Sequence, residues 1–119
     1  MATARKRKLS GSTDGRGIKV AATSTPGTTI HTAILGTTLG AFDEIWLWAY
    51  NSDSSDRVIT VEFGGTTVPD DNIKVTVPTL AGLQLIVPGL ILQNSSVVKV
   101  FCPTANVIVI SGFVNTISD

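Results

Sequence analysis

Apolar and polar residues alternate along most of the chain in the pattern of β-strands. Ile59, Val61 and Phe63 fall on one face of a predicted strand, and mostly polar side chains alternate with them. This period of two is typical of a strand with one buried face. No window shows the period of 3.6 residues that an amphipathic helix requires. The alternation predicts strands at residues 17–22, 28–35, 43–51, 56–63, 72–78, 83–87, 89–93, 96–102 and 106–117.

Turn-forming residues separate these predicted strands. Pro26-Gly27, Gly64-Gly65 and Pro88-Gly89 lie between them, and such pairs favour tight turns. Short strands at nearly regular spacing indicate an all-β sandwich or barrel, and 119 residues suffice for one domain. We therefore expect a single jelly-roll-like antiparallel β-sandwich of eight or nine short strands over residues 17–119, preceded by an extended N-terminal arm over residues 1–16.

Two of the predicted strands are apolar on both faces, although a sandwich buries only one face of each strand. Residues 45–50 alternate aliphatic with aromatic side chains, and residues 107–114 are aliphatic or aromatic at most positions. The second face therefore needs a cover, which is the N-terminal arm, a loop or a neighbouring subunit. Only 15% of the residues are charged and the net charge is zero, which favours an oligomer or a docked protein. We assign six residues to a subunit or partner interface: Trp46, Trp48, Tyr50, Ile108, Ile110 and Val114.

The zero net charge hides an uneven distribution along the chain. Residues 1–20 hold six basic residues and one acid, whereas residues 21–119 hold three basic residues and eight acids. The first 16 residues are polar and glycine-containing, which predicts a flexible arm that is a solvated tail, a nucleic-acid-binding arm or a strap for an acidic protein surface. The acidic remainder would repel phosphate backbones, so we do not expect direct nucleic-acid binding. The predicted partner-binding residues of the arm are Arg5, Lys6, Arg7, Lys8 and Arg16.

No arrangement of residues that would perform catalysis or hold a metal is evident. His31 is the only histidine and Cys102 the only cysteine, which excludes multi-histidine metal centres and CxxC zinc sites. No GxSxG motif is present, and the acids between residues 51 and 56 do not have the spacing of an EF-hand loop. We therefore expect a protein that is not an enzyme and has no cofactor or metal. No apolar run reaches the ~18 residues of a transmembrane helix, so no membrane association is expected.

In size, composition and pattern, the chain resembles the small head decoration (cement) proteins of tailed double-stranded DNA bacteriophages. Residues 16–23, 43–51 and 106–117 carry the resemblance. It implies a non-enzymatic structural protein that binds the major capsid protein on the outer capsid surface as a homo-oligomer, with a homotrimer favoured over a dimer. The oligomer would clamp neighbouring capsomers, with the basic arm as a docking strap. The protein would be made in the host cytoplasm without a signal peptide and then join the virion.

A second hypothesis places the chain in another functional class. Trp46, Trp48 and Tyr50 alternate along one strand and would provide stacking surfaces for sugar rings. The alternative is therefore a carbohydrate- or receptor-binding β-sandwich module of a phage tail or similar particle. Such a module requires the three rings to be open to solvent in the assembled oligomer.

Overall fold

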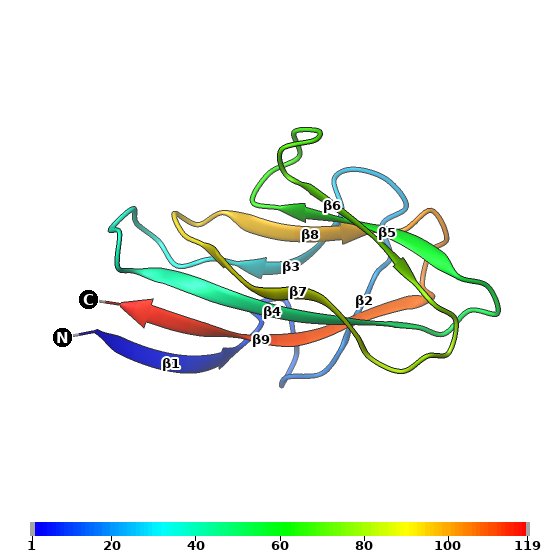
Figure 1. The fold of residues 1–119 in the computed structure, drawn as a ribbon, viewed down its shortest axis with the longest axis horizontal. Coiled ribbons are helices and arrows are strands. Elements are labelled where there is room, and N and C mark those ends of the chain that lie inside the picture. The colour runs from blue at the N-terminus through cyan, green and yellow to red at the C-terminus, as the bar shows by residue number, and fades with distance from the viewer. Residues whose placement is uncertain (1, 119) are drawn as a thin grey trace.

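The described residues form two antiparallel β-sheets that pack on each other. The computed structural model describes residues 2–118, and this part of the chain contains nine strands and no helix (Figure 1). The all-β antiparallel sandwich expected from the sequence is thereby confirmed. The strands are β1 (Thr3–Lys8), β2 (Ile18–Lys19), β3 (Thr28–Thr32), β4 (Phe42–Asn51), β5 (Arg57–Phe63), β6 (Asn72–Val77), β7 (Gln84–Leu92), β8 (Val97–Phe101) and β9 (Ile108–Ser118).

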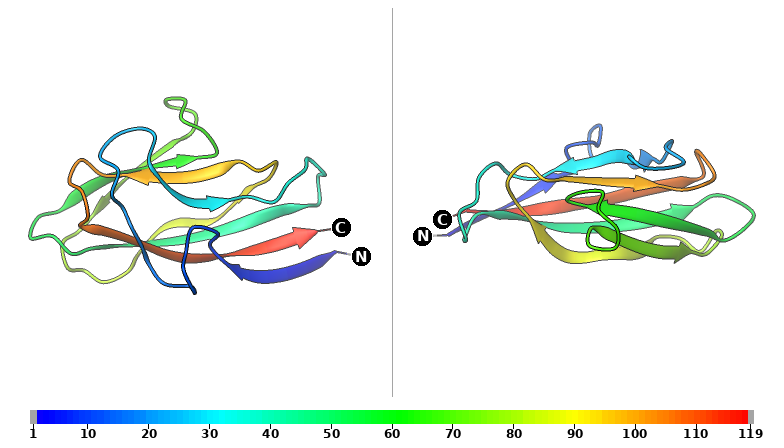
Figure 2. Two further views of the ribbon diagram at one scale, coloured as in Figure 1. Left: turned by 180° about the vertical axis from the view of Figure 1, so that it is seen from behind. Right: turned by 90° about the horizontal axis from the view of Figure 1, so that it is seen from above.

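The strand pairs are nested along the chain. The first sheet has the order β1-β9-β4-β7, with β2 also paired to β9, and the second has the order β3-β8-β5-β6. The first two strands therefore pair with the last strand, β3 with β8, β4 with β7, and β5 with β6. Figure 2 shows the two layers from behind and from above, with β1 and β9 side by side and both ends of the chain at one end of the sandwich.

From β2 onward the observed strands follow the predicted ones closely, with one merger. The two strands predicted at 83–87 and 89–93 form a single strand, β7, which continues through Pro88 and Gly89. The register between β4 and β7 shifts at this point, between Ile45 and Trp46. Proline lacks the backbone N–H that a sheet ladder uses, and an edge strand with a bulge tolerates that loss.

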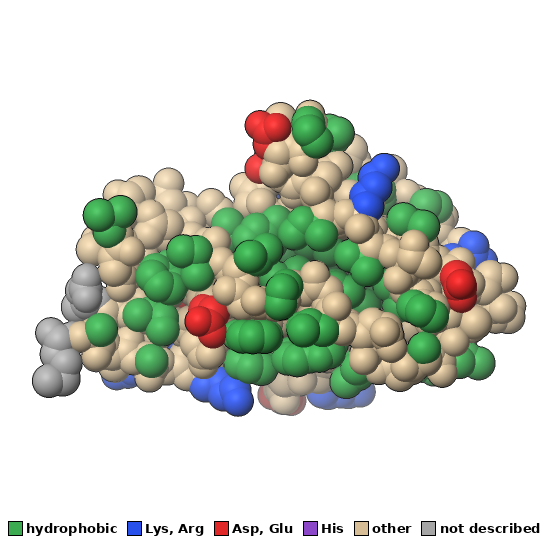
Figure 3. All heavy atoms as spheres, in the orientation of Figure 1, with side chains coloured by type: hydrophobic (Ala, Val, Ile, Leu, Met, Phe, Trp, Pro, Cys, Tyr) green, Lys and Arg blue, Asp and Glu red, His purple; other side chains and the backbone are tan. Residues whose placement is uncertain are grey.

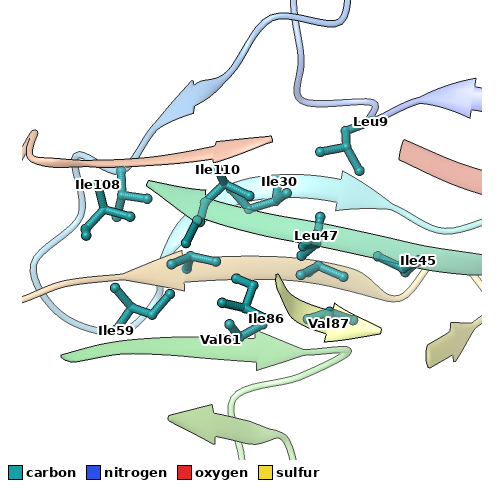
Figure 4. Close-up of a cluster of buried hydrophobic side chains, with 14 of the residues drawn as sticks. Leu9, Ile30, Ile45, Leu47, Ile59, Val61, Ile86, Val87, Ile108 and Ile110 are labelled. Carbon is teal, nitrogen blue, oxygen red and sulfur yellow. The ribbon is translucent and has the colours of Figure 1, made fainter. Parts of the chain in front are cut away.

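The hydrophobic core lies between the two sheets. Ile45, Leu47 and Ala49 of β4 point into it and are completely buried, while the side chains between them point outward. Aliphatic side chains from both sheets meet there (Figure 4). The largest completely or almost completely buried hydrophobic side chains are Leu9, Val20, Ile30, Ile45, Leu47, Ile59, Val61, Val77, Val87, Ile108 and Ile110.

The N-terminal segment is ordered as a strand, which corrects the expectation of a flexible arm over residues 1–16. Residues 3–8 pair antiparallel with β9, from Thr3 opposite Ser118 to Lys8 opposite Phe113. Leu9, which is 1% exposed, then enters the core and anchors the strand. All six side chains of β1 are exposed, so the backbone pairing with β9 leaves no alternating pattern in the sequence. Residue 1 of the predicted arm lies outside the described residues.

Candidate interaction surface

The outer face of the β1-β9-β4-β7 sheet carries all three aromatic side chains predicted to be functional. Residues that pair directly across strands point to the same side of a sheet, so the register defines rows of outward side chains. Trp46, Trp48 and Tyr50 are partly buried on this face, opposite the core residues of β4. We call this surface the aromatic face. Its rows across the sheet are Lys6, Asn115, Glu44 and Ile91; then Lys8, Phe113, Trp46 and Pro88; then Ser111, Trp48 and Leu85; and then Lys19, Val109 and Tyr50.

Three aromatic rings stack on one another at the centre of this face. The ring centroids of Trp46 and Trp48 are 6.4 Å apart, and Phe113 lies 6.4 Å from Trp46 and 6.0 Å from Trp48. The interplanar angles lie between 17° and 28°, so the three rings are nearly parallel. Aromatic pairs at such separations contribute about 0.5–1.5 kcal/mol each beyond their burial. The cluster is therefore a preformed feature with little conformational freedom.

Gly89 on β7 makes room for the central ring. A Cβ atom at this position would lie 2.8 Å from Cζ2 of Trp46, closer than real Cβ atoms come. Its φ of +78° also lies in the left-handed region, which glycine adopts without steric cost. The indole of Trp46 therefore lies against the backbone of β7, and the aromatic cluster extends to the edge of the sheet.

Charged groups border the aromatic cluster on one side. Glu44 accepts hydrogen bonds from Trp46 Nε1 at 2.7 Å and from Asn115 Nδ2 at 3.1 Å. These bonds, the one from Trp46 first, lower the pKa of Glu44 below its ordinary value, so the group is a carboxylate at neutral pH. The Nζ atom of Lys6 lies 4.3 Å from the ring centroid of Phe113, in a cation–π contact. One carboxylate and one ammonium thus lie within the same row.

The basic residues of the predicted arm form an exposed edge of the same sheet. Arg5 and Arg7 pair with inward positions of β9, whereas Lys6 and Lys8 pair with outward positions. The four cations therefore alternate between the two sides of an edge strand. Figure 3 shows Lys and Arg side chains along the lower margin, where β1 lies, below hydrophobic side chains over β4, β7 and β9. Arg16, the fifth predicted residue, is exposed in the turn between β1 and β2.

Three of the predicted interface residues face the core instead, which corrects their assignment. Ile108, Ile110 and Val114 are completely buried between the sheets. The opposite face of β9 presents Val109 and Phe113 outward. The assignment was wrong because both faces of this strand are apolar, so alternation alone does not indicate which face points inward.

A buried polar network ties the two sheets together near the start of β4. Asp43 Oδ2 lies 2.7 Å from His31 Nε2, and Asp43 Oδ1 accepts a bond of 2.7 Å from Thr116 Oγ1. The backbone N–H of Ser10 donates to His31 Nδ1 at 3.0 Å, so Nε2 carries the proton that faces Asp43. Both ring nitrogens of His31 are therefore engaged. Neither is free to act as a general base.

The remaining side chains that could act as a nucleophile or as metal ligands do not come together in a catalytic or metal-binding site. Cys102 is completely buried, and within residues 2–118 no group of three or more histidine, cysteine, aspartate or glutamate side chains is placed to hold a metal ion. In the same residues no helix is long and apolar enough to cross a membrane.

Three residues that complete the aromatic face were not predicted from the sequence. Phe113, Leu85 and Ile91 were missed because only the strand pairing brings them beside β4.

The comparisons with known proteins assign no family. A scan against protein-family models matches none, and searches of the curated proteins and of the solved structures find no match.

Proposed function

We propose that the chain is a non-enzymatic structural protein of a phage virion, a decoration or cement protein on the outer capsid surface. It acts there as an oligomer that clamps neighbouring capsomers by binding the major capsid protein. The observation that carries the proposal is one sheet with an apolar aromatic face beside a basic edge strand. Such a combination fits a protein that binds other protein surfaces on two sides.

We also infer that the sandwich is a jelly roll. Taking β1 and β2 together as the first of eight strands, the pairs are first with eighth, second with seventh, third with sixth, and fourth with fifth. A long hairpin of four nested strand pairs that folds over into two sheets has this order. It contains the two Greek keys of a jelly roll.

The basic edge supports a docking role different from that of a loose strap. Because β1 is already paired with β9, the backbone that carries its arginines is ordered before binding, and only their side chains remain to be ordered. Arg5 and Arg7 project from the edge on the side opposite Lys6 and Lys8 and reach a partner's carboxylates through their exposed guanidinium groups. Many copies on one capsid lattice would add avidity to a contact that is weak in a single copy.

The polar network supports a protein without enzymatic activity. His31 has no free ring nitrogen, and Cys102 is buried among core side chains. A nucleophile and a general base within hydrogen-bonding distance of each other are the usual requirement for covalent catalysis. The residues with these chemistries serve the packing of the sandwich. We further propose that the protein is made in the host cytoplasm without a signal peptide and then joins the outer capsid surface.

Co-sedimentation with heads of the phage that encodes the chain tests this proposal. Wild-type protein is expected to sediment with heads, and Arg5→Glu/Arg7→Glu is expected to bind at least about tenfold more weakly, because it places like charges against the acidic surface. The control Lys74→Glu reverses the charge of an exposed side chain on the other sheet and is expected to bind like the wild type. Wild-type protein that stays in the supernatant would overturn the proposal.

The aromatic face also favours a second candidate, a carbohydrate-binding module. Trp46, Trp48 and Phe113 are flanked by the polar side chains of Ser111 and Asn115, as in sites that stack and hydrogen-bond sugars. Under this alternative, isolated host surface polysaccharide changes the tryptophan fluorescence of the protein. The polysaccharide has no such effect if the face is covered by protein.

A further inference from the structure

We propose that the aromatic face is the contact between two copies of this chain, related by a two-fold axis that runs parallel to the strands between β9 and β4. The inference deepens the proposed function by naming the surface that makes the protein oligomeric. It rests on that function in one respect, because the proposed function requires an oligomer. The proposed oligomer is a dimer, whereas the resemblance described in the sequence analysis favoured a trimer.

The two sheets differ in how their outer faces are covered. On the second sheet, Glu62 points outward from β5 but is 1% exposed, because the loop before β3 lies over it. Thr25 Oγ1 and the backbone N–H of Gly27 both donate to its carboxylate at 2.6 Å. On the first sheet, β1 lies at the edge and leaves the aromatic face uncovered. The chain thus covers part of the outer face of the second sheet with its own loop, at Glu62.

The size of the aromatic face suits a pair of modest affinity. Four strands about 4.8 Å apart and four outward rows about 7 Å apart along β4 give roughly 500 Å² of flat area. Two copies would therefore bury about 1,000 Å², which is the size that a specific interface should reach. Leu85 and Ile91, at 49% and 53% exposed, would gain most from this burial.

The distribution of charge on the face determines the direction of the axis. Lys6, Lys8 and Lys19 all lie on the side of the face formed by β1 and β2, whereas β7 on the other side presents Leu85 and Ile91. An axis across the strands would place β1 of one copy over β1 of the other and bring the lysines together. An axis along the strands places β1 over β7, so the lysines of one copy lie over the apolar side chains of the other copy and not over its lysines.

This axis also makes the centre of the face self-complementary. It places β4 of one copy over β9 of the other, with each row facing its equivalent. Trp46 then lies over Phe113 of the second copy, and Glu44 over Asn115 with Lys6 beside it. Aromatic rings meet aromatic rings, and the carboxylate approaches an amide and an ammonium group. A contact in which the same patch serves both copies is the usual form of a two-fold interface.

The mass of the protein in solution tests the inference. Light scattering on a sizing column is expected to show the mass rising from that of one chain, 12.5 kDa, toward twice this value as the concentration increases from about 1 to about 100 µM, a range typical of modest protein affinities. Trp48→Lys places a charge at the centre of the face and is expected to weaken dimerisation at least about tenfold. The matched control is Val58→Lys on β5, where the replaced side chain is 49% exposed on the other sheet, and this variant is expected to remain a dimer.

Tryptophan fluorescence gives a second readout that does not depend on a variant. Trp46 and Trp48 are the only two tryptophans of the chain, and both lie on the aromatic face. Acrylamide should therefore quench the wild-type fluorescence more strongly as dilution separates the copies. Circular dichroism shows whether Trp48→Lys is folded; if it is not, the dilution series alone decides.

Three outcomes would overturn the inference. They are a monomer throughout the concentration range, a mass of three chains, and a dimer that Trp48→Lys leaves intact. A monomer that still sediments with phage heads would refute the two-fold contact and leave the proposed binding to the capsid standing. A dimer that does not bind heads would refute the proposed function and leave the contact standing.

Discussion

Replacing Asp43 with alanine is expected to destabilise the fold far more than the loss of one charged side chain from the surface. Its carboxylate is 3% exposed and accepts three hydrogen bonds, from the ring of His31, the hydroxyl of Thr116 and the backbone N–H of Ile34. These donors come from both sheets and from the segment after β3. Alanine at this position leaves all three without their partner.

The magnitude follows from the number of donors. A buried donor without a partner costs about 1–3 kcal/mol, and part of the total is regained because a buried charge is removed. We expect Asp43→Ala to lower the free energy of unfolding by about 3–5 kcal/mol. Thr116→Val removes one of the bonds and is expected to cost about 1–2 kcal/mol alone. In the double variant that bond is already lost, so the two effects should fall short of additivity by about 1 kcal/mol or more.

Urea unfolding followed by circular dichroism measures these free energies. The control is Asp70→Ala, which removes the same charge from an exposed turn and is expected to change stability by less than about 0.5 kcal/mol. If Asp43→Ala costs no more than this control, or if the two network substitutions are simply additive, the network does not stabilise the sandwich as described.

Two further predictions concern the core and one surface ion pair. Leu47→Ala, at a completely buried position, is expected to cost about 2–5 kcal/mol in urea unfolding, whereas Leu39→Ala, at a side chain 96% exposed, is expected to change little; equal effects would contradict the assigned core. Arg57 donates to Asp53 from Nε at 2.6 Å and is the main cause of the lowered pKa of this carboxyl group. The charged carboxylate therefore stabilises the fold above the ordinary pKa, and this contribution is lost as the pH falls through the lowered one. Carboxyl NMR titration should show the midpoint of Asp53 rising toward its ordinary value in Arg57→Gln; an unchanged midpoint would refute the assigned cause.

Strand positions were predictable from the sequence because a strand that buries one face needs an apolar residue at every second position. β5 and β6 were recognised almost to the residue, since polar side chains alternate with Ile59, Val61 and Ile73. The merged strand β7 was divided in the prediction because Pro88 and Gly89 ordinarily mark a turn. Here they occupy an edge strand, where a missing N–H leaves no central ladder incomplete.

The surface could be predicted only in part, and the reason differs between strands. Trp46 and Trp48 were assigned to an interface from the sequence and do point outward, because the smaller aliphatic side chains of β4 occupy the core. In β9 the two faces are equally apolar, so Ile110 and Val109 exchange roles if the register moves by one residue. β1 was not predicted because backbone hydrogen bonds to β9 hold it in place, and these bonds do not depend on the pattern of side chains.

The pairing of β1 with β9 has a consequence for how the chain folds. These two strands are the farthest apart in sequence and yet lie side by side, with Thr3 opposite Ser118. Their contact carries the longest loop-closure cost of the molecule, and a high contact order slows folding. A circular permutant that joins residue 118 to residue 3 through a short turn, with new ends in the exposed loop around Gly36, would convert this pair into a local hairpin. In the same sandwich, the contact with the largest separation along the sequence would then become one between neighbouring segments of the chain.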